Sequence, residues 1–263
     1  MLGQCRMVEE RLERCARLVG ETGIERLRRS RVAVFGLGGV GSYCAEALAR
    51  SGVGWLRVVD HDVVSRSNMN RQLVATSATL GQGKAEAARA RLQEVAPGIV
   101  VDARSDFFCA ETAETLLDGG LDVVVDAIDS LGPKVELVAQ CRERSLLVVS
   151  SLGAAARLDP TAIRVVPMAK TRGDPLGVQV RKRLRRRGGL DGVMAAYSEE
   201  PRRPSAPGVW TPTTTDLCRG RQRLIQPSAV MVPAAMGMTI AAYVVAHLAK
   251  VPFRHVESGS PSH

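Results

Sequence analysis

The stretch Arg31-Val-Ala-Val-Phe-Gly-Leu-Gly-Gly-Val-Gly41 decides the fold that we expect for this chain. It begins with a short apolar run, which predicts a buried strand. Gly36, Gly38 and Gly41 follow in the pattern G-x-G-x-x-G, and residues 42–50 then place alanine and leucine at helical spacing. A strand, a glycine-rich turn and a helix in this order are typical of nucleotide-binding α/β domains, because backbone N–H groups at the start of the helix can approach a phosphate.

The chain after this motif alternates between strand and helix patterns. Residues 55–60 form a second strand pattern that ends in Asp60, a carboxylate placed to accept hydrogen bonds from ribose hydroxyls. Further strands are expected at 99–103, 121–126, 145–150 and 163–166, and helices at 82–95 and 134–144. The alternation predicts an α/β chain with a Rossmann-like, doubly wound and mostly parallel sheet. An NAD-dependent oxidoreductase would share these features.

We expect three regions around this motif. Residues 1–30 form an N-terminal helical arm with charged and apolar side chains at helical spacing. Residues 31–168 form the nucleotide-binding domain. Residues 169–263 form a C-terminal extension on the substrate side, with a basic segment, a mobile loop at about 185–209 and an apolar helix.

The apolar segment at 228–249 is long enough to span a bilayer. It contains Pro233, Gly237 and His247 and has no strong aromatic belt. We therefore expect a buried helix that closes the sheet, without stable membrane insertion, although association with a membrane is left open. The N-terminus lacks the pattern of a secretory signal, which favours the cytoplasm.

The net charge and the cysteine content limit which partners and metal sites the chain is expected to have. The 36 Lys and Arg residues against 27 Asp and Glu residues give a net charge of +9, which favours polyanionic partners such as nucleic acid. The six cysteines form no C-x-x-C pair. This pattern predicts a reduced, cytosolic chain without a structural zinc.

A polar segment after the second strand carries candidate phosphate ligands. Asn70, Arg71 and Gln72 lie within it, and Lys84 opens the next helix. A dehydrogenase does not need so many donors beside its nucleotide, whereas a triphosphate attacked at its α-phosphorus does. The alternative is a solvated polar loop.

Asp126 and Asp129 follow a hydrophobic strand at the edge where ligands bind in such folds. A carboxylate there can hold Mg²⁺ against phosphates, with water and the nucleotide completing the coordination. We assign this role to Asp129 in preference to Asp126. The alternatives are a turn carboxylate for Asp126 and a helix N-cap for Asp129.

Together these motifs resemble the E1-like activating enzymes of the ThiF, MoeB and HesA type, from about Arg11 to Ser150. The resemblance implies ATP and Mg²⁺, and a homodimer in which Arg14 reaches the partner's triphosphate; the alternative for Arg14 is an exposed helix face. The cofactor-binding residues that it implies are Gly36, Gly38, Gly39, Gly41, Asp60, Asp62, Asn70, Arg71, Gln72 and Lys84. The catalytic residues that it implies are Arg14, Asn70, Arg71, Lys84 and Asp129.

The second half of the chain resembles one branch of that family, the tRNA threonylcarbamoyladenosine dehydratases (TcdA or CsdL). The segments that carry the resemblance are 169–176, 180–185 and 197–200. It implies ATP-dependent dehydration of N6-threonylcarbamoyladenosine at position 37 of tRNA to its cyclic form. The tRNA-binding residues would be Arg181, Lys182, Arg183, Arg185, Arg186 and Arg187, since RNA needs a phosphate-binding surface. The alternative for this cluster is a solvated helix face.

Two other functions stay open at this point. An adenylyltransferase of a ubiquitin-like sulfur carrier would share every ATP-binding residue, although such enzymes usually carry two C-x-x-C zinc pairs. An NAD-dependent oxidoreductase would bind a nicotinamide and turn over no ATP. A sulfur-transfer protein is a further candidate partner.

Overall fold

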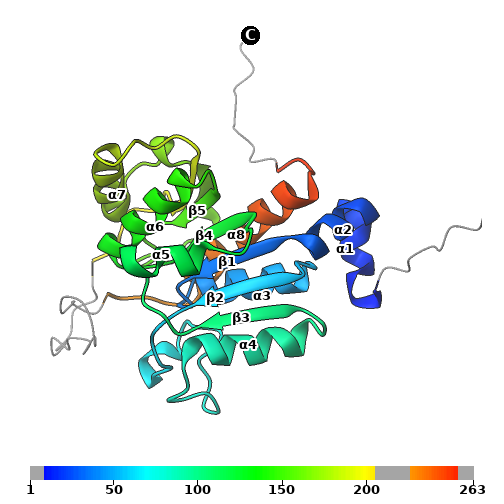
Figure 1. Ribbon diagram of the computed structural model, residues 1–263. Coiled ribbons are helices and arrows are strands. Elements are labelled where there is room, and N and C mark those ends of the chain that lie inside the picture. Colours follow the sequence, from blue (N-terminus) through cyan, green and yellow to red (C-terminus); the bar gives the residue numbers. More distant parts are fainter. Residues whose placement is uncertain (1–8, 205–225, 254–263) are drawn as a thin grey trace, which may run out of the picture.

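A computed structural model of the chain describes residues 9–204 and 226–253. Its centre is a seven-stranded sheet with the order β3-β2-β1-β4-β5-β7-β6 (Figure 1). The strands are β1 (Arg31–Phe35), β2 (Trp55–Val59), β3 (Val100–Arg104), β4 (Val123–Asp126), β5 (Leu147–Ser151), β6 (Ile163–Pro167) and β7 (Val193–Ser198). Neighbouring strands are parallel, except that β6 and β7 are antiparallel. The expected Rossmann-like, mostly parallel sheet is confirmed.

Helices cover both faces of this sheet. The α-helices of the described residues are α1 (Glu13–Val19), α2 (Glu21–Arg29), α3 (Gly41–Arg50), α4 (Lys84–Val95), α5 (Ala110–Leu117), α6 (Leu131–Glu143), α7 (Pro175–Arg185) and α8 (Met231–Ala249), and those from α3 onward flank the sheet. Val32 and Val34 of β1 belong to the core beneath α3, α4 and α8, whereas Ala33 and Phe35 belong to the core beneath α5 and α6. Because both faces are buried, the strand is apolar at consecutive positions and does not alternate with polar residues.

The N-terminal arm consists of two short helices that are preceded by a 3₁₀ turn (Glu10–Leu12). Gly20 separates α1 from α2 with a φ of 78°, a conformation that favours glycine. The arm lies at the amino ends of the strands, because α2 runs directly into β1 and the Leu27 carbonyl accepts the N–H of Gly54 just before β2.

Helix α8 packs against α3 beside the glycine-rich turn. A Cβ atom on Gly237 would lie 2.3 Å from the Val40 carbonyl oxygen, so glycine permits this close approach. By length and composition α8 is apolar enough to cross a membrane, and 44% of its most apolar window is buried within the protein. Such a helix is weak evidence for a membrane span, because core helices of soluble proteins pass the same test.

Two elements differ from the sequence-based expectations. The expected mobile loop at 185–209 is wrong for Val193–Ser198, which forms the interior strand β7 between β5 and β6. The Gly and Arg residues before it obscured this short apolar run; residues 205–209 lie outside the described residues. Helix α5 was not expected, because its eight residues give too short a periodic pattern.

Candidate functional site

The glycine-rich turn lies at the carboxyl ends of β1, β2 and β4. Gly36 has a φ of 86°, and a Cβ atom there would lie 2.7 Å from the Ala127 carbonyl oxygen. A Cβ atom on Gly41 would lie 1.8 Å from the carbonyl oxygen of Gly36. Any other residue at these two positions would displace the turn. A Cβ atom on Gly38 would meet only Gln72 Nε2, at 3.8 Å, so Gly38 leaves the turn open above its backbone.

Asp60 lies directly after β2, is buried, and stabilises the glycine-rich turn through hydrogen bonds. Its Oδ2 accepts the N–H of Leu37 at 2.7 Å, and its Oδ1 accepts the N–H of Asp62 at 2.9 Å. Burial raises the pKa of Asp60 above its usual range, against the opposing effects of Lys84 and of these two N–H groups. Asp60 therefore sets the distance between the turn and the end of β2.

Asp62 and Lys84 form an ion pair beside Asp60. Lys84 Nζ lies 2.8 Å from Asp62 Oδ2, and the Lys84 side chain is 6% exposed while that of Asp62 is 40% exposed. Lys84 is the first residue of α4. The pair thus presents an accessible carboxylate and holds a buried ammonium at the same edge of the sheet.

Arg71 and Asn70 lie in the loop that follows a short 3₁₀ helix (Arg66–Asn68). Arg71 Nη1 donates to the Ser67 carbonyl at 2.9 Å and to Asn70 Oδ1 at 2.8 Å, and Asn70 Nδ2 donates to the Ser228 carbonyl at 2.9 Å. Burial lowers the pKa of Arg71, while the negative charge of Asp129 opposes this effect. The tertiary structure therefore brings two candidate residues, Arg71 and Asp129, from separate loops within electrostatic reach of each other.

Gln72 has a buried oxygen without a hydrogen-bond partner. The residue is 7% exposed, and its Oε1 accepts no hydrogen bond from the described residues. Buried acceptors of this kind are rare, because leaving one unpaired costs about 1–3 kcal/mol. The amide group of Gln72 lies beside the turn, since its Nε2 would be 3.8 Å from a Cβ atom on Gly38, and a donor group bound there could reach the unpaired oxygen. These polar groups fit a nucleotide.

Asp126 has a structural environment that the sequence did not reveal. Its Oδ2 lies 2.7 Å from Lys134 Nζ and accepts the Ser150 hydroxyl at 2.6 Å, and both ion-pair side chains are 0% exposed. Asp126, the second candidate for holding Mg²⁺, does not fit that role, because Lys134 neutralises its charge within the core. The helical pattern contained Lys134, but only the sheet order could identify its partner.

Asp129 stands three residues further on, in the loop before α6. Its side chain is exposed, and Ser130 occupies the N-cap position of α6. The alternative interpretation of Asp129 as that N-cap is therefore wrong. An exposed carboxylate next to Arg71 is the kind of oxygen donor that Mg²⁺ prefers.

Comparison with known proteins identifies the family. A family model described as the ThiF family matches residues 11–257. The chain belongs to the ThiF family. It is 40% identical over 233 residues to the tRNA threonylcarbamoyladenosine dehydratase of Bacillus subtilis (strain 168), which covers 88% of this chain and 92% of that protein. The molybdopterin-synthase adenylyltransferase of Salmonella typhimurium is 39% identical over 140 residues, covering 52% of this chain and 54% of that protein.

Solved structures agree with this assignment. The crystal structure of Escherichia coli tRNA N6-threonylcarbamoyladenosine dehydratase, TcdA, in complex with ATP has a TM-score of 0.79 to this chain. The two share 32% sequence identity, over 90% of this chain and 93% of that chain. This ThiF-family chain therefore belongs to the tRNA threonylcarbamoyladenosine dehydratase branch.

Arg14 of the ThiF-family chain lies far from the glycine-rich turn. It is exposed on α1, and the next residue, Cys15, has its Sγ 3.7 Å from the carbonyl oxygen of Ser51. Ser51 follows α3, whose first residue is Gly41. Since a helix of this length spans about 15 Å, Arg14 does not join the other candidates within one subunit.

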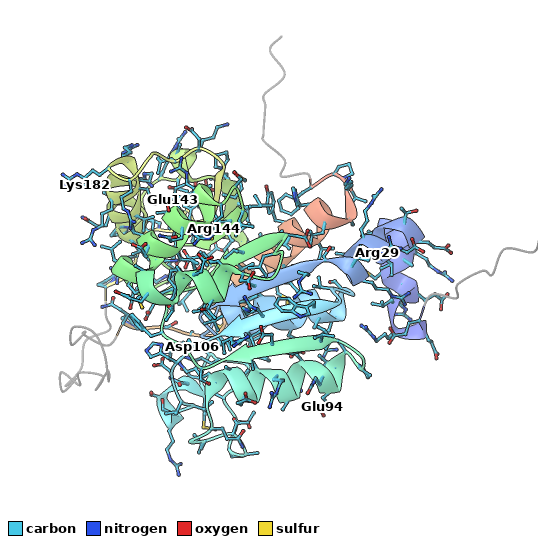
Figure 2. All side chains as sticks on the ribbon, viewed as in Figure 1. Arg29, Glu94, Asp106, Glu143, Arg144 and Lys182 are labelled. Atoms are coloured by element: carbon cyan, nitrogen blue, oxygen red, sulfur yellow. The ribbon has the colours of Figure 1, made fainter. Side chains whose placement is uncertain are left out.

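The basic cluster of the ThiF-family chain lies on and just after α7, at the periphery (Figure 2). Arg181 donates to the Thr171 hydroxyl, and Arg187 pairs with Glu136 of α6. The other four side chains are exposed and form no ion pair with the described residues: Lys182, Arg183, Arg185 and Arg186. Figure 2 shows Lys182 at the opposite end of the molecule from Arg29.

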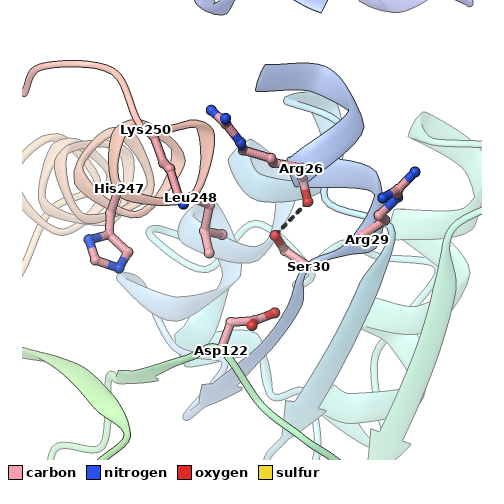
Figure 3. A pocket seen from close by; sticks show the side chains of 7 residues that line it. All are labelled: Arg26, Arg29, Ser30, Asp122, His247, Leu248 and Lys250. Carbon is pink, nitrogen blue, oxygen red and sulfur yellow. Dashed lines mark hydrogen bonds between the residues drawn. The ribbon is translucent and has the colours of Figure 1, made fainter. Parts of the chain in front are cut away.

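A cavity of about 380 Å³ lies elsewhere in the ThiF-family chain (Figure 3). Its lining residues come from the end of α2, the end of α8 and the start of β4: Arg26, Arg29, Ser30, Asp122, His247, Leu248 and Lys250. This is the amino edge of the sheet. Its basic side chains are partly offset by Asp122 and by the helix C-terminus, where Arg26 donates to the Ala249 carbonyl at 3.0 Å. The cavity is distinct from the site at the carboxyl edge.

Three of the four described cysteines, Cys15, Cys44 and Cys141, do not resemble catalytic nucleophiles. Cys44 and Cys141 are buried, and burial raises the pKa of both thiols, which disfavours the reactive thiolate. Burial also raises the pKa of Cys15. Cys5 and Cys218 lie outside the described residues.

Proposed function

We propose that this chain uses ATP to dehydrate N6-threonylcarbamoyladenosine at position 37 of tRNA to its cyclic form. The observation that carries the proposal is the extent of the match: 88% of the chain aligns with a tRNA threonylcarbamoyladenosine dehydratase, against 52% with a molybdopterin-synthase adenylyltransferase. Its structural relative TcdA has been crystallised in complex with ATP. The open glycine turn and the unpaired Gln72 oxygen support the same nucleotide.

In this proposal the nucleotide lies over the turn formed by Gly36, Gly38, Gly39 and Gly41. Asp62 accepts the ribose hydroxyls, because it is the more accessible carboxylate, and Asp60 holds the turn that faces them. Gln72 accepts a hydrogen bond from the bound nucleotide. The ribose is thereby fixed at the end of β2.

Cationic and amide groups surround the phosphates in this proposal. Arg71 and Lys84 neutralise phosphate oxygens from two sides of the turn, and Asn70 orients Arg71 through its amide oxygen. Asp129 would hold Mg²⁺ through its carboxylate, and the ion would neutralise part of the phosphate charge. Asp126 and Lys134 take no part except to hold the Asp129 loop.

ATP transfers a phosphorus-containing group, adenylyl or phosphoryl, to one carboxylate oxygen of the substrate. That oxygen then departs with AMP or phosphate when the ring closes. A carboxylate is a poor electrophile until this transfer happens. The carbamoyl nitrogen or oxygen of the same nucleoside then closes the ring, and the modified nucleoside loses one water overall. Because the nucleophile is intramolecular, the protein needs to hold the geometry and supply positive charge, and it needs no covalent cysteine.

The tRNA is bound by the basic cluster on and after α7 in this proposal, and residues 1–30 serve as an arm in a homodimer. The distance of Arg14 from its own turn supports a role at the partner's site. Residues 31–168 then form the ATP-binding domain and 169–263 the substrate-side extension. We expect the enzyme in the cytoplasm, where its RNA substrate is found; a sulfur-transfer partner stays a prediction.

Mass spectrometry of nucleosides tests the proposal. Threonylcarbamoylated tRNA is incubated with the protein and Mg-ATP, beside the Arg71→Ala and Asp129→Ala variants. We expect an ATP-dependent loss of one water from the modified adenosine with the wild type and a strongly reduced yield of that product with either variant. An unchanged nucleoside, with ATP consumed on another carboxylate, would show that the substrate assignment is wrong.

A further inference from the structure

Helix α7 begins at a buried ion pair. Asp174 is its N-cap residue, and Asp174 Oδ1 accepts the N–H of Gly177 at 2.7 Å. The other oxygen, Oδ2, lies 3.0 Å from Arg157 Nη2, and the two side chains are 1% and 0% exposed. A charged pair that is removed this far from water must be held in one geometry, because any other arrangement leaves a charge unpaired.

Arg157 joins three separate segments at this point. Its Nε donates to the Glu200 carbonyl after β7 at 2.8 Å, and its Nη1 donates to the Gly153 carbonyl after β5. Close packing surrounds the pair, since a Cβ atom on Gly153 would lie 2.7 Å from Asp174 Oδ2. The first turn of α7 is therefore tied to the ends of β5 and β7 through one guanidinium group.

The same strand ends lead to the candidate nucleotide site. The Ser151 carbonyl at the end of β5 accepts Lys134 Nζ at 2.9 Å, and Lys134 pairs with Asp126 at the end of β4. Asp126 Oδ1 in turn accepts the N–H of Ile128, the residue before Asp129. Two buried ion pairs thus connect the start of α7 with the loop that carries Asp129.

We propose that Arg157, through its buried ion pair with Asp174, is a positioning residue that fixes the direction of α7 and so aligns the exposed cations of that helix with the nucleotide site. The inference rests on the proposed RNA substrate. Helix α7 is about 16 Å long, so a tilt of about 10° at its first turn would move its last residues by about 3 Å. A cation that moves by this distance loses its contact with an RNA phosphate and is left in water.

Asp174→Asn is the variant that tests this role. The amide oxygen can still cap α7, but the ion pair is lost. Removal of a negative charge should by itself strengthen binding to RNA, so a loss of affinity cannot be a simple charge effect. A second variant, Asp174→Asn with Arg157→Met, removes both charges, so no unpaired charge stays in the core. Asp102→Asn is the matched control, because it removes a carboxylate paired with Arg57 and Arg104 in β2 and β3, away from α7.

Fluorescence anisotropy with labelled tRNA, ATP binding and thermal unfolding are measured on all four proteins. We expect tRNA affinity to fall at least about fivefold in both Asp174 variants, with ATP affinity unchanged. The Asp102→Asn control should lose thermal stability and keep its tRNA affinity. Wild-type affinity in either folded Asp174 variant, or an equal loss in the control, would overturn the inference.

The nucleoside assay separates this inference from the proposed function. If wild-type protein binds tRNA but does not dehydrate the modified adenosine, the proposed reaction fails, while a selective loss of affinity in the Asp174 variants still supports the role of Arg157. If wild-type protein does not bind tRNA, both ideas fail.

Discussion

Asp60 and Asp126 lie at the ends of the two strands that flank β1, and both are buried. Asp60 accepts hydrogen bonds from two backbone N–H groups, and burial raises its pKa. Asp126 is paired with Lys134 and accepts the hydroxyl of Ser150. The same residue type at equivalent positions of one sheet therefore serves two purposes, and the side chain supplied by the neighbouring element decides which one.

The ends of β2 and β4 also differ in whether their polar groups are free to bind a ligand. The end of β2 keeps polar groups accessible around Asp60, with Asp62 partly exposed and Gln72 unpaired. At the end of β4, Lys134 of α6 neutralises the carboxylate of Asp126. A carboxylate whose charge is already neutralised in the core has no capacity left for a metal ion.

The largest expected effect on stability comes from breaking the buried ion pair between Asp126 and Lys134. Asp126→Ala leaves the Lys134 ammonium buried and unpaired, which should lower the free energy of unfolding by about 3–5 kcal/mol in urea denaturation. The control is Asp126→Leu with Lys134→Met, which should unfold close to the wild type because no charge remains. If Asp126→Ala unfolds like the wild type and only loses activity, Asp126 is a functional carboxylate and the comparison fails.

Arg71→Ala should affect activity and spare the fold. We expect dehydration activity to fall about 10²–10³-fold, because a preorganised cation beside the phosphates is lost. The free energy of unfolding should change by no more than about 0.5 kcal/mol. Arg66→Ala is the matched control, since Arg66 is an exposed arginine of the 3₁₀ helix just before that loop. Equal activity losses in the two variants would argue against a specific role for Arg71.

Asp60→Asn should have a smaller effect on stability than Asp126→Ala. One N–H of the turn loses its acceptor, at a cost of about 1–3 kcal/mol. The pKa of Asp60 is raised in the folded protein, so its contribution to stability is present below the unfolded pKa and is lost as pH rises through the folded pKa. The stability difference between the two proteins in urea should therefore shrink as pH rises from the acid range to neutrality. A stability difference that grows with pH would show that the pKa of Asp60 is not raised in the folded protein.

The exposed cations of α7 should give the smallest effect. Lys182→Ala with Arg183→Ala should lower the slope of log affinity for tRNA against log salt by about 1–2 and leave ATP binding unchanged. Arg187→Ala is the comparison variant and should lower the slope less, because Arg187 is already paired with Glu136. A slope that is the same in the double variant and in wild type would show that RNA does not contact this face.

Local sequence patterns were sufficient for much of the fold. The glycines of the turn were predictable because the strand and helix around them have clear periodicity, and the structure gives Gly36 a positive φ, which favours glycine. Strand β7 was hidden because it is short and follows a run of Arg and Gly residues. Its identity as a strand depends on hydrogen bonds to β5 and β6, which lie far away along the chain.

The sequence by itself determined the nucleotide-binding turn, the parallel sheet and the branch of the ThiF family, because each depends on residues close together along the chain. Only the tertiary structure decided that Asp126 pairs with Lys134, that Arg157 pairs with Asp174, and that Arg14 lies near the far end of α3 from its own turn. Ion pairs and separations of this kind are set by the order of strands in the sheet. That order follows from the burial of all the apolar segments together, and no single segment encodes it.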